Sequence, residues 1–242
     1  MPTIAHLSDI HLDGSDERLA RLTRVLDEAA CVGADAVVLT GDLADRGLPA
    51  EYAQFRDAMA GDRPWIAVPG NHDLREAARP FLGDTADGPL DQVLDIPGLR
   101  IVGLDSLVEG ATEGALAQAS LEFADRAVRS APGPVVLALH HPPVPVGHQV
   151  MDELGLRDPG GLARIAGTPA VAAVLTGHVH TSLAARFAGT PLLGAGGVAS
   201  TMRLGSRTDP IADARAMPAF AVHVFDDDGW VRTVFHPLSP QA

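Results

Sequence analysis

The sequence contains few cysteines and few basic residues. Cys31 is the one cysteine among 242 residues, so an intrachain disulfide is excluded, and we expect Cys31 to be a core residue that closes the first helix. Lysine and arginine together number 18 against 31 acidic residues, which gives a formal net charge of −13. A non-specific binder of DNA or RNA needs a basic surface, so we expect no nucleic-acid polymer as a partner.

The chain also lacks the apolar segments that secretion or membrane insertion requires. Its N-terminus has no basic region followed by a long apolar stretch, and Ile4 to Leu7 already has the pattern of a strand. The longest uncharged runs, residues 133–151 and 167–185, are interrupted by His, Pro and Gly. We therefore expect a cytoplasmic protein without a membrane contact.

What the sequence does contain is an alternation of strand and helix patterns. A hydrophobic content of 46% over this length fits one α/β domain spanning residues 1–242. Strand and helix patterns alternate as far as Thr176, and only strands follow, which predicts one α/β domain with two sheets or one large mixed sheet. Five helices are expected. They lie around Leu19 to Ala29, where apolar residues recur at helical spacing, at Pro49 to Ala60, from Leu74 onward, at Leu116 to Ser130, and at Gly160 to Ala166. The expected strands include Thr3 to Ser8, Ala36 to Leu39, Trp65 to Val68, Val135 to Leu139, Val171 to Leu175, Phe220 to Phe225 and Trp230 to His236.

Five of the expected strands are followed by polar side chains of the same kinds. The segments are Ser8-Asp9-Ile10-His11, Thr40-Gly41-Asp42, Gly70-Asn71-His72-Asp73, His140-His141-Pro142-Pro143 and Thr176-Gly177-His178-Val179-His180. The carboxyl ends of parallel strands lie at one edge of a sheet, where ligands bind in open α/β folds. We therefore expect these carboxylates, imidazoles and the amide to converge, although they lie far apart in the sequence.

Metal ions would compensate for the cost of burying so many ionisable groups together. Ligation by Asp, His and Asn without cysteine suits divalent ions such as Mn, Fe, Zn or Co. Asp9 and His11, like His178 and His180, are two positions apart, so an extended strand places each pair on one face, where it can serve a pair of metals. A single match of this kind could equally be a polar turn that caps a helix. Recurrence at five strand ends favours the metal site.

The complete set of motifs resembles the calcineurin-like metallophosphoesterase superfamily. Its pattern D-x-H, G-D, G-N-H-[D/E], H and G-H-x-H is present in order from Asp9 to His180. The chain length, the lack of a large insertion and the segment His140 to Pro143 look most like the bacterial class III cyclic-nucleotide phosphodiesterases and the glycerophosphodiesterases. The resemblance implies a four-layer α/β/β/α sandwich with mixed sheets and a site at one edge.

Carried over by position, the resemblance assigns seven metal ligands. One metal would be held by Asp9, His11 and His180, and Asp42 would bridge to a second metal held by Asn71, His140 and His178. His140 is preferred to His141 because the ligand in the family is the histidine that closes the strand. His141 would then support a ligand or contact the substrate.

The resemblance also implies which residues act on the substrate. His72 would protonate or stabilise the leaving group beside Asn71, oriented by a carboxylate for which Asp45 and Asp73 are both candidates. Asp73 could equally cap the following helix. Arg46 follows Asp45 as in the Ser/Thr protein phosphatases, where the arginine contacts phosphate, but a surface salt bridge is the simpler interpretation.

Charge counting explains how an acidic protein could bind an anionic phosphate. The net charge of the site is about +1 if it holds two divalent ions, two carboxylates and a bridging hydroxide and if the histidines are neutral. A metal pair lowers the pKa of the bridging water and stabilises in-line displacement, so hydroxide can attack phosphorus directly. The sequence accordingly contains neither a G-x-S-x-G nucleophile elbow nor a Walker-type phosphate loop.

We therefore expect a hydrolase with two divalent, or iron and divalent, metal ions that acts on a small phosphodiester such as cyclic AMP. The alternatives are a phosphomonoesterase, which Asp45-Arg46 favours, and a non-catalytic scaffold, which the complete ligand set disfavours. Two features lie outside this site. His6 is expected to be a core or supporting histidine, and the segment Ser200 to Pro218 could be a lid, a homodimer contact or a plain surface loop.

Overall fold

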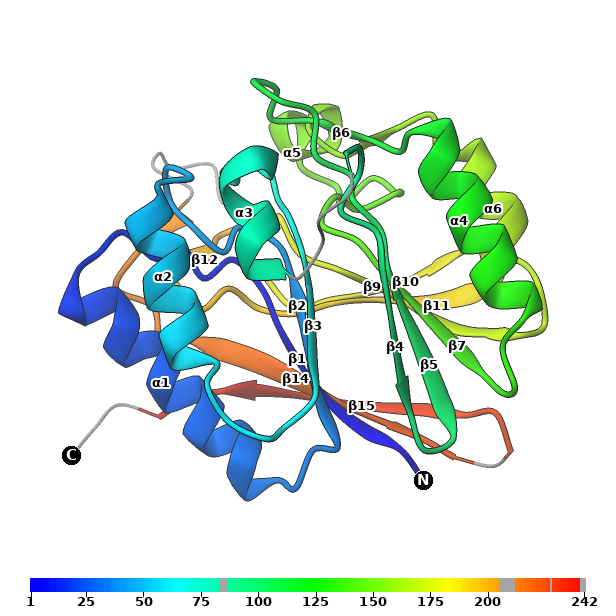
Figure 1. Ribbon diagram of the computed structural model, residues 1–242, viewed down its shortest axis with the longest axis horizontal. Coiled ribbons are helices and arrows are strands. Elements are labelled where there is room, and N and C mark those ends of the chain that lie inside the picture. The colour runs from blue at the N-terminus through cyan, green and yellow to red at the C-terminus, as the bar shows by residue number, and fades with distance from the viewer. Residues whose placement is uncertain (83–86, 205–211, 227, 240–242) are drawn as a thin grey trace.

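The computed structural model describes residues 1–82, 87–204, 212–226 and 228–239. Two β-sheets face each other, and helices cover the outer side of each sheet (Figure 1). This is the four-layer α/β/β/α sandwich that the resemblance predicted. The helices are α1 (Asp16–Cys31), α2 (Pro49–Ala58), α3 (Arg75–Leu82), α4 (Gln118–Arg129), α5 (Gln149–Glu153) and α6 (Gly160–Ala166).

The strands form two large mixed sheets and two short pairs. The strands are β1 (Thr3–Leu7), β2 (Ala36–Thr40), β3 (Trp65–Val68), β4 (Gln92–Ile96), β5 (Leu99–Gly103), β6 (Gly114–Ala115), β7 (Val135–Ala138), β8 (Leu156–Arg157), β9 (Val171–Thr176), β10 (Leu183–Phe187), β11 (Thr190–Gly194), β12 (Thr201–Met202), β13 (Ala212–Asp213), β14 (Ala219–Phe225) and β15 (Val231–Pro237). The first sheet has the order β15-β14-β1-β2-β3 and the second β10-β11-β9-β7-β5-β4. The short pairs are β12-β13 and β6-β8.

Parallel strands occupy the centre of each large sheet. In the first sheet β1, β2 and β3 are parallel, and β14 and β15 are antiparallel additions. In the second sheet β11, β9, β7 and β5 are parallel, and the end strands β10 and β4 are antiparallel. The loops at the carboxyl ends of the central strands carry all five polar motifs.

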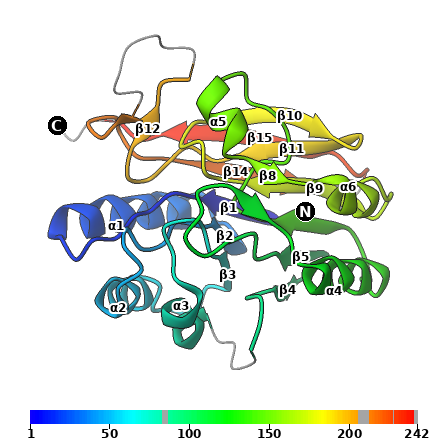
Figure 2. The same ribbon diagram turned by 90° about the horizontal axis from the view of Figure 1, so that it is seen from above.

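Alternating side chains fill the apolar layers between these elements. In β2, Val37 and Leu39 pack under the helices of the first sheet, whereas Ala36 and Val38 face the second sheet. The same alternation occurs in β7, between the inter-sheet layer and the layer under α4 and α6. Figure 2 shows α1 and α2 on one side of the sandwich and α4 and α6 on the opposite side.

The structure corrects the prediction for Cys31, which is exposed. Helix α1 buries Leu22, Val25 and Ala29, and Cys31 lies two residues past Ala29, about 200° around the helix. The expected helices and strands are present with small shifts at their ends. Within the segment from Ser200 to Pro218, the described residues form the β12-β13 pair, and residues 205–211 lie outside the described part. In the described part of the chain no helix is both long and apolar enough to cross a membrane.

Candidate metal centre

The loops after β1, β2, β7 and β9 bring most of the predicted metal ligands together. Asp9, His11, Asp42 and His180 are buried, and one ligand atom from each lies within 4.8 Å of the others. A second group with the same spacing contains His140, His141 and His178. Buried carboxylates and imidazoles therefore converge at one edge of the sandwich, as the strand ends indicated.

Asp42 lies between the two groups. Its Oδ2 atom is 3.4 Å from His11 Nε2 and 3.5 Å from His140 Nε2, while Oδ1 accepts a hydrogen bond from the main-chain N–H of His72 at 2.9 Å. Burial acts to raise the pKa of Asp42, but His140 and His11 hold this pKa well below its usual value. One carboxylate oxygen thus faces both groups, which fits the bridging position predicted for Asp42.

Hydrogen bonds to the far ring nitrogen orient three of the histidines. His140 Nδ1 donates to the main-chain carbonyl of Thr40 at 2.7 Å, so Nε2 is directed at Asn71 Oδ1, 3.2 Å away. His11 Nδ1 lies 3.2 Å from Asp45 Oδ1, and His180 Nδ1 lies 2.8 Å from the Ser200 hydroxyl. Metal-binding histidines usually have such a partner, because it fixes the tautomer and the ring. The Nε2 atoms of His11 and His180 then face each other at 3.3 Å.

Two buried polar atoms of the site have no hydrogen-bond partner among the described residues. They are Asp9 Oδ2 and His178 Nε2. Burial, with the nearby His140, lowers the pKa of His178 to about 4, so its ring is neutral at pH 7 and keeps a lone pair. Unpaired buried groups of this kind are uncommon because they cost free energy, and two bound cations, one at each group, would satisfy them. The donor set therefore fits the predicted metal ions.

His141 uses both of its ring nitrogens away from the centre. Nε2 donates to the main-chain carbonyl of Thr112 at 3.1 Å, which leaves Nδ1 to accept from the Ser106 hydroxyl at 2.8 Å. Burial lowers the pKa of His141 well below its usual value, so no second proton is expected. Although His141 lies within the second group of candidate ligands, it has no free lone pair for a metal. The geometry thus favours His140 as the ligand, and His141 ties residues 106–112 to the site.

His72 is the exposed histidine of the site. Its Nδ1 donates to the main-chain carbonyl of Asp45 at 2.8 Å, and its ring packs edge-on against His11 with 4.5 Å between centroids. The resemblance predicts that a carboxylate orients His72. The carbonyl of Asp45 does so, because the Asp45 carboxylate is turned toward His11. The sequence pattern shows where carboxylates are, but it contains no signal for a main-chain acceptor.

Asp73 joins the loops that carry Asp42 and Asn71. Its buried carboxylate accepts hydrogen bonds from the Tyr52 hydroxyl at 3.0 Å and from main-chain N–H groups of both loops. These main-chain donors are Leu43, Ala44 and Gly70, at 3.1, 3.0 and 2.8 Å. Burial and the nearby Asp42 raise the pKa of Asp73 to about 6. Asp73 is therefore a support of the loops rather than the partner of His72.

Arg46 forms the expected surface salt bridge. Its guanidinium lies 3.2 Å from a carboxylate oxygen of Glu51, and 61% of its side chain is exposed. The other oxygen of Glu51 accepts from the main-chain N–H groups of Arg46 and Leu48. Arg46 is thus held at the surface by the start of α2.

Five of the predicted ligands have a left-handed backbone. Their φ angles lie between 49° and 70°, and the residues are Asp9, His11, Asp42, His178 and His180. In the described part of the chain, Asp158 and Ala188 are the other non-glycine residues with positive φ. This conformation costs about 1–2 kcal/mol per residue and collects at functional sites. The i, i+2 ligand pairs therefore lie in strained loops beyond the strands and not in the extended strands that the sequence suggested.

Close packing explains two glycines of the motifs. A Cβ atom on Gly70 would lie 2.2 Å from Asp42 Oδ1, and one on Gly41 would lie 2.5 Å from His140 Nδ1. A larger residue at either position would displace a predicted ligand.

Comparison with known proteins identifies the family of this chain. The sequence profile of the family described as calcineurin-like phosphoesterase matches residues 2–182. The chain is 36% identical over 260 residues to the cAMP/cGMP dual specificity phosphodiesterase of Mycobacterium tuberculosis, covering 98% of this chain and 79% of that protein. It is also 36% identical over 162 residues to the 3′,5′-cyclic adenosine monophosphate phosphodiesterase of Escherichia coli, covering 66% of this chain and 59% of that protein.

A solved structure shows the same fold at low sequence identity. A dimetal phosphatase from Danio rerio superimposes with a TM-score of 0.68 at 14% identity, covering 97% of this chain and 95% of that one. The likeness of structure thus extends beyond the residues that the family profile matches. From the family profile and the similarity to these relatives, we conclude that this chain belongs to the calcineurin-like phosphoesterase family.

Proposed function

We propose that the protein hydrolyses a small phosphodiester, with a cyclic 3′,5′-nucleotide as the first candidate, at a centre that holds two divalent metal ions. The observation that carries this proposal is the convergence of two ligand groups on Oδ2 of Asp42. The choice of substrate rests on relatives with 35–36% identity that are named as phosphodiesterases of cyclic nucleotides.

Seven side chains would hold the two ions, in the division that the resemblance gave. Asp9, His11 and His180 would bind one ion, Asn71, His140 and His178 the other, and Asp42 both. Oxygen and imidazole donors suit Mn, Fe, Zn or Co. When bound, a metal pair polarises phosphoryl oxygens and makes water a strong nucleophile at neutral pH.

His72 has the position of a residue that acts on the substrate. It is exposed at the rim of a buried cluster, and its Nδ1–H is committed to the carbonyl of Asp45. Nε2 is therefore the atom that can carry a proton to a leaving alkoxide. Asp45 would place two groups at once, His72 through its carbonyl and His11 through its carboxylate.

A substrate panel tests the proposal. With added Mn²⁺, we expect hydrolysis of cyclic AMP and of bis-p-nitrophenyl phosphate, and much weaker hydrolysis of p-nitrophenyl phosphate. Preference for the monoester would instead support a phosphomonoesterase, although Arg46, whose position favoured that reading, is paired with Glu51. No turnover of any phosphoester by metal-loaded protein would indicate a non-catalytic scaffold.

The replacement His72→Ala tests the role of the exposed histidine. A general acid typically contributes about 10² to 10⁴-fold, and most when the leaving group is a poor one such as a ribose alkoxide. We therefore expect His72→Ala to retain its metals, to lose most hydrolysis of cyclic AMP and to lose far less hydrolysis of the nitrophenyl diester. His148→Ala, outside the site, is the matched control. Equal losses on both substrates would indicate phosphate binding, and loss of a metal would make His72 a ligand.

A further inference from the structure

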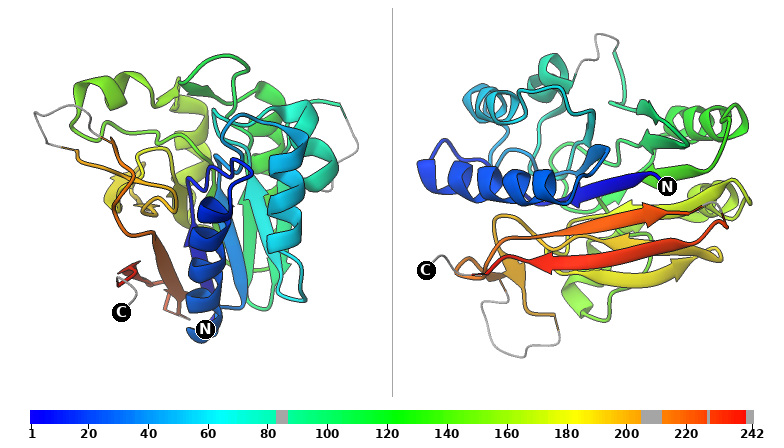
Figure 3. Two further views of the ribbon diagram at one scale, coloured as in Figure 1. Left: turned by 90° about the vertical axis from the view of Figure 1, so that its left-hand side faces the viewer. Right: turned by 90° about the horizontal axis from the view of Figure 1, so that it is seen from below.

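Two arginines of helix α1 contact the chain between β11 and β14. Arg21 donates from Nε to the main-chain carbonyl of Val198 at 2.8 Å and from Nη2 to that of Ala216 at 2.6 Å. Arg18, one turn earlier, donates to the carbonyl of Ala199 at 2.8 Å. Figure 3 shows α1, in blue, beside the orange chain that leads into β14. The two side chains thus join segments that lie 177 to 195 positions apart in the sequence.

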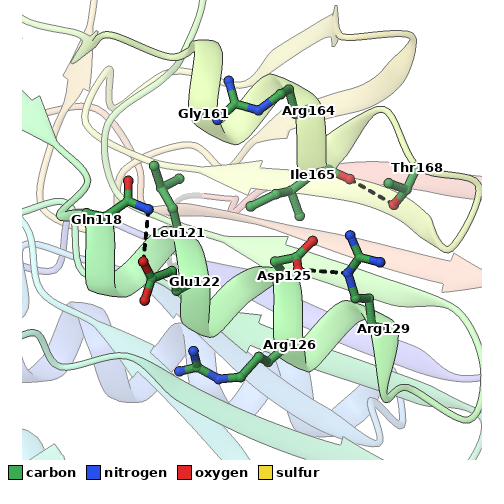
Figure 4. Close-up of a pocket in the computed structure, with 10 residues that line it drawn as sticks. All are labelled: Gln118, Leu121, Glu122, Asp125, Arg126, Arg129, Gly161, Arg164, Ile165 and Thr168. Carbon is green, nitrogen blue, oxygen red and sulfur yellow. Dashed lines mark hydrogen bonds and ion pairs between the residues drawn. The ribbon is translucent and has the colours of Figure 1, made fainter.

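Two arginines of helices α4 and α6 make contacts of a different kind. In the pocket between these helices, Figure 4 shows Arg129 turned toward Asp125 of its own helix, at 2.7 Å. Arg164 donates to the main-chain carbonyl of Gly160, four residues before it in α6. Both contacts are exposed and stay within one helix. The arginines of α1 instead hold main chain that lies next to the metal centre.

The main chain that α1 holds also contacts two predicted ligands of one metal ion. Residues 197–200 are buried. The main-chain N–H of Ala199 donates to the carbonyl of Asp9, and that of Gly197 donates to the carbonyl of His180, both at 3.0 Å. The segment is therefore hydrogen-bonded to α1 on one side and to the metal centre on the other.

The last residue of this segment, Ser200, contacts a ligand through its side chain. Its hydroxyl lies 2.8 Å from His180 Nδ1. With Nε2 as the metal ligand, Nδ1 carries the proton and donates to the hydroxyl oxygen, which fixes the tautomer and the orientation of the ring. The packing is close, because a Cβ atom on Gly197 would lie 3.1 Å from His180 Nδ1. The position of the segment therefore determines the position of the imidazole.

We propose that Arg21 is a positioning residue for the metal ion predicted beside His180. Its guanidinium fixes the main chain at Val198, Arg18 adds a contact at the next residue, and the Ser200 hydroxyl then holds the imidazole. A guanidinium suits this role because its N–H donors have a fixed planar geometry, so that one side chain can hold two carbonyls at once. The inference rests on the metal centre of the proposed function, and it adds a residue that holds one of the two ions without touching it.

Calorimetric titration of the metal-free protein with Mn²⁺ tests the proposal without a measurement of activity. Wild type should bind two ions, and Asn71→Ala, which removes a predicted ligand of the other ion, identifies the binding step of that ion. Ser200→Ala should weaken the remaining step by about 10- to 100-fold, and Arg21→Ala, one residue further away, by at least about threefold. Arg24→Ala is the matched control and should change neither step. Arg24 also donates from α1 to a main-chain carbonyl, that of Ser239, near the C-terminal end of the described chain.

A double variant separates positioning from a general loss of packing. Because Arg21 acts through Ser200, Arg21→Ala should change the Mn²⁺ affinity little when Ser200 is already replaced by alanine. Ser200→Thr retains the hydroxyl and should bind Mn²⁺ nearly as tightly as wild type. Arg21→Lys keeps the charge and the aliphatic stem but cannot hold both carbonyls, so its affinity should lie between those of wild type and Arg21→Ala.

Three results would overturn the inference while leaving the metal centre in place. They are two tightly bound ions in folded Arg21→Ala with unchanged affinities, equal effects of Arg21→Ala and Arg24→Ala, and full additivity of Arg21→Ala with Ser200→Ala. Thermal unfolding of the metal-free variants checks each fold, and Arg21→Lys replaces Arg21→Ala in the comparison if the alanine variant does not fold. A wild-type protein that binds no Mn²⁺ would overturn the metal centre and this inference together.

Discussion

The protein buries two groups of histidines, and they differ in what their ring nitrogens contact. Between the sheets, His6 Nε2 lies 2.8 Å from the Thr40 hydroxyl, His6 Nδ1 lies 3.2 Å from His223 Nε2, and His223 Nδ1 lies 2.8 Å from the Thr233 hydroxyl. Each nitrogen of this pair has a protein partner. In the metal centre, His178 Nε2 has no partner among the described residues.

The difference shows that burial alone does not identify a metal-binding histidine. His6 and His223 are fully buried, as is His140. What distinguishes the centre is an unpaired nitrogen, an unpaired carboxylate oxygen on Asp9, and the left-handed backbone of five predicted ligands. His6 and His223 therefore have the hydrogen bonds expected of histidines in a protein core. The metal centre leaves ligand atoms unpaired, as expected of a site that binds cations.

Removal of metal ions should have the largest effect. Chelation is expected to abolish hydrolysis of bis-p-nitrophenyl phosphate, and Mn²⁺ or Co²⁺ should restore it, because the ligands contain no thiolate. The inter-sheet pair should be unaffected, so the far-UV circular dichroism of the metal-free protein is expected to remain native. Full turnover by protein that elemental analysis shows to be metal-free would contradict the assignment of the centre.

Asp42→Ala should be the most damaging single ligand change. It removes the side chain that faces both groups, so we expect loss of at least one tightly held metal and at least about a 100-fold fall in turnover. Asp125→Ala, in a surface salt bridge of α4, is the control. Two tightly held metals per chain in Asp42→Ala would show that Asp42 is not the bridge.

His223→Leu should lower stability and leave the metals in place. It leaves His6 Nδ1 buried without its partner, which costs about 1–3 kcal/mol in the free energy of unfolding. The double variant His6→Leu/His223→Leu should recover part of this loss, since both partners are replaced. Denaturant titration and elemental analysis measure the two effects. Loss of metal from folded His223→Leu would place the pair within the metal centre.

The same pair should make stability depend on pH. Burial lowers the pKa of His223 to about 3, and burial with the nearby His223 lowers the pKa of His6 well below its usual value. In the unfolded chain both histidines have a pKa of about 6.5. The neutral pair therefore makes its full contribution to the free energy of unfolding above this pH, and this contribution is lost as the pH falls toward 3. Below pH 6 the free energy of unfolding should fall less steeply in the double leucine variant than in wild type. Parallel curves would contradict the neutral pair.

Backbone conformation should give the smallest of these effects. In metal-free protein, His180→Gly should be about 1 kcal/mol more stable than His180→Ala, because His180 has a φ of 50° that glycine adopts without strain. At His223, in strand β14, the order should reverse, since glycine weakens a strand interior. Thermal unfolding of the four variants checks both orders. Alanine more stable than glycine at position 180 would argue against strain there.

The sequence was sufficient for the fold and for the convergence of the ligands. Strand ends with Asp, Asn and His are local patterns, and parallel pairing brings them together wherever they lie in the chain. The supports of the site were not predictable. Ser200, the Thr40 carbonyl and the Asp45 carbonyl contact ligands or His72 through tertiary packing, with no local signal in the sequence.

The roles of two adjacent histidines could not be predicted from the sequence either. His140 and His141 are neighbours in one motif, and only the contacts of His141 with Thr112 and Ser106 separate their roles. His223 belongs to no sequence motif, and its partner His6 lies 217 positions away, so the sequence contains no local signal for their contact. The sequence predicts a core or supporting histidine at His6, and its complete burial confirms the place in the core.

Anomalous diffraction from crystals grown with Mn²⁺ would show how many ions the centre binds and which residues hold them. We expect two anomalous peaks, one in contact with Asp9, His11 and His180 and the other with Asn71, His140 and His178, with the Asp42 carboxylate touching both. No peak is expected at His141 or between His6 and His223. A single peak, or one bound by His141 in place of His140, would contradict the two-metal centre described here.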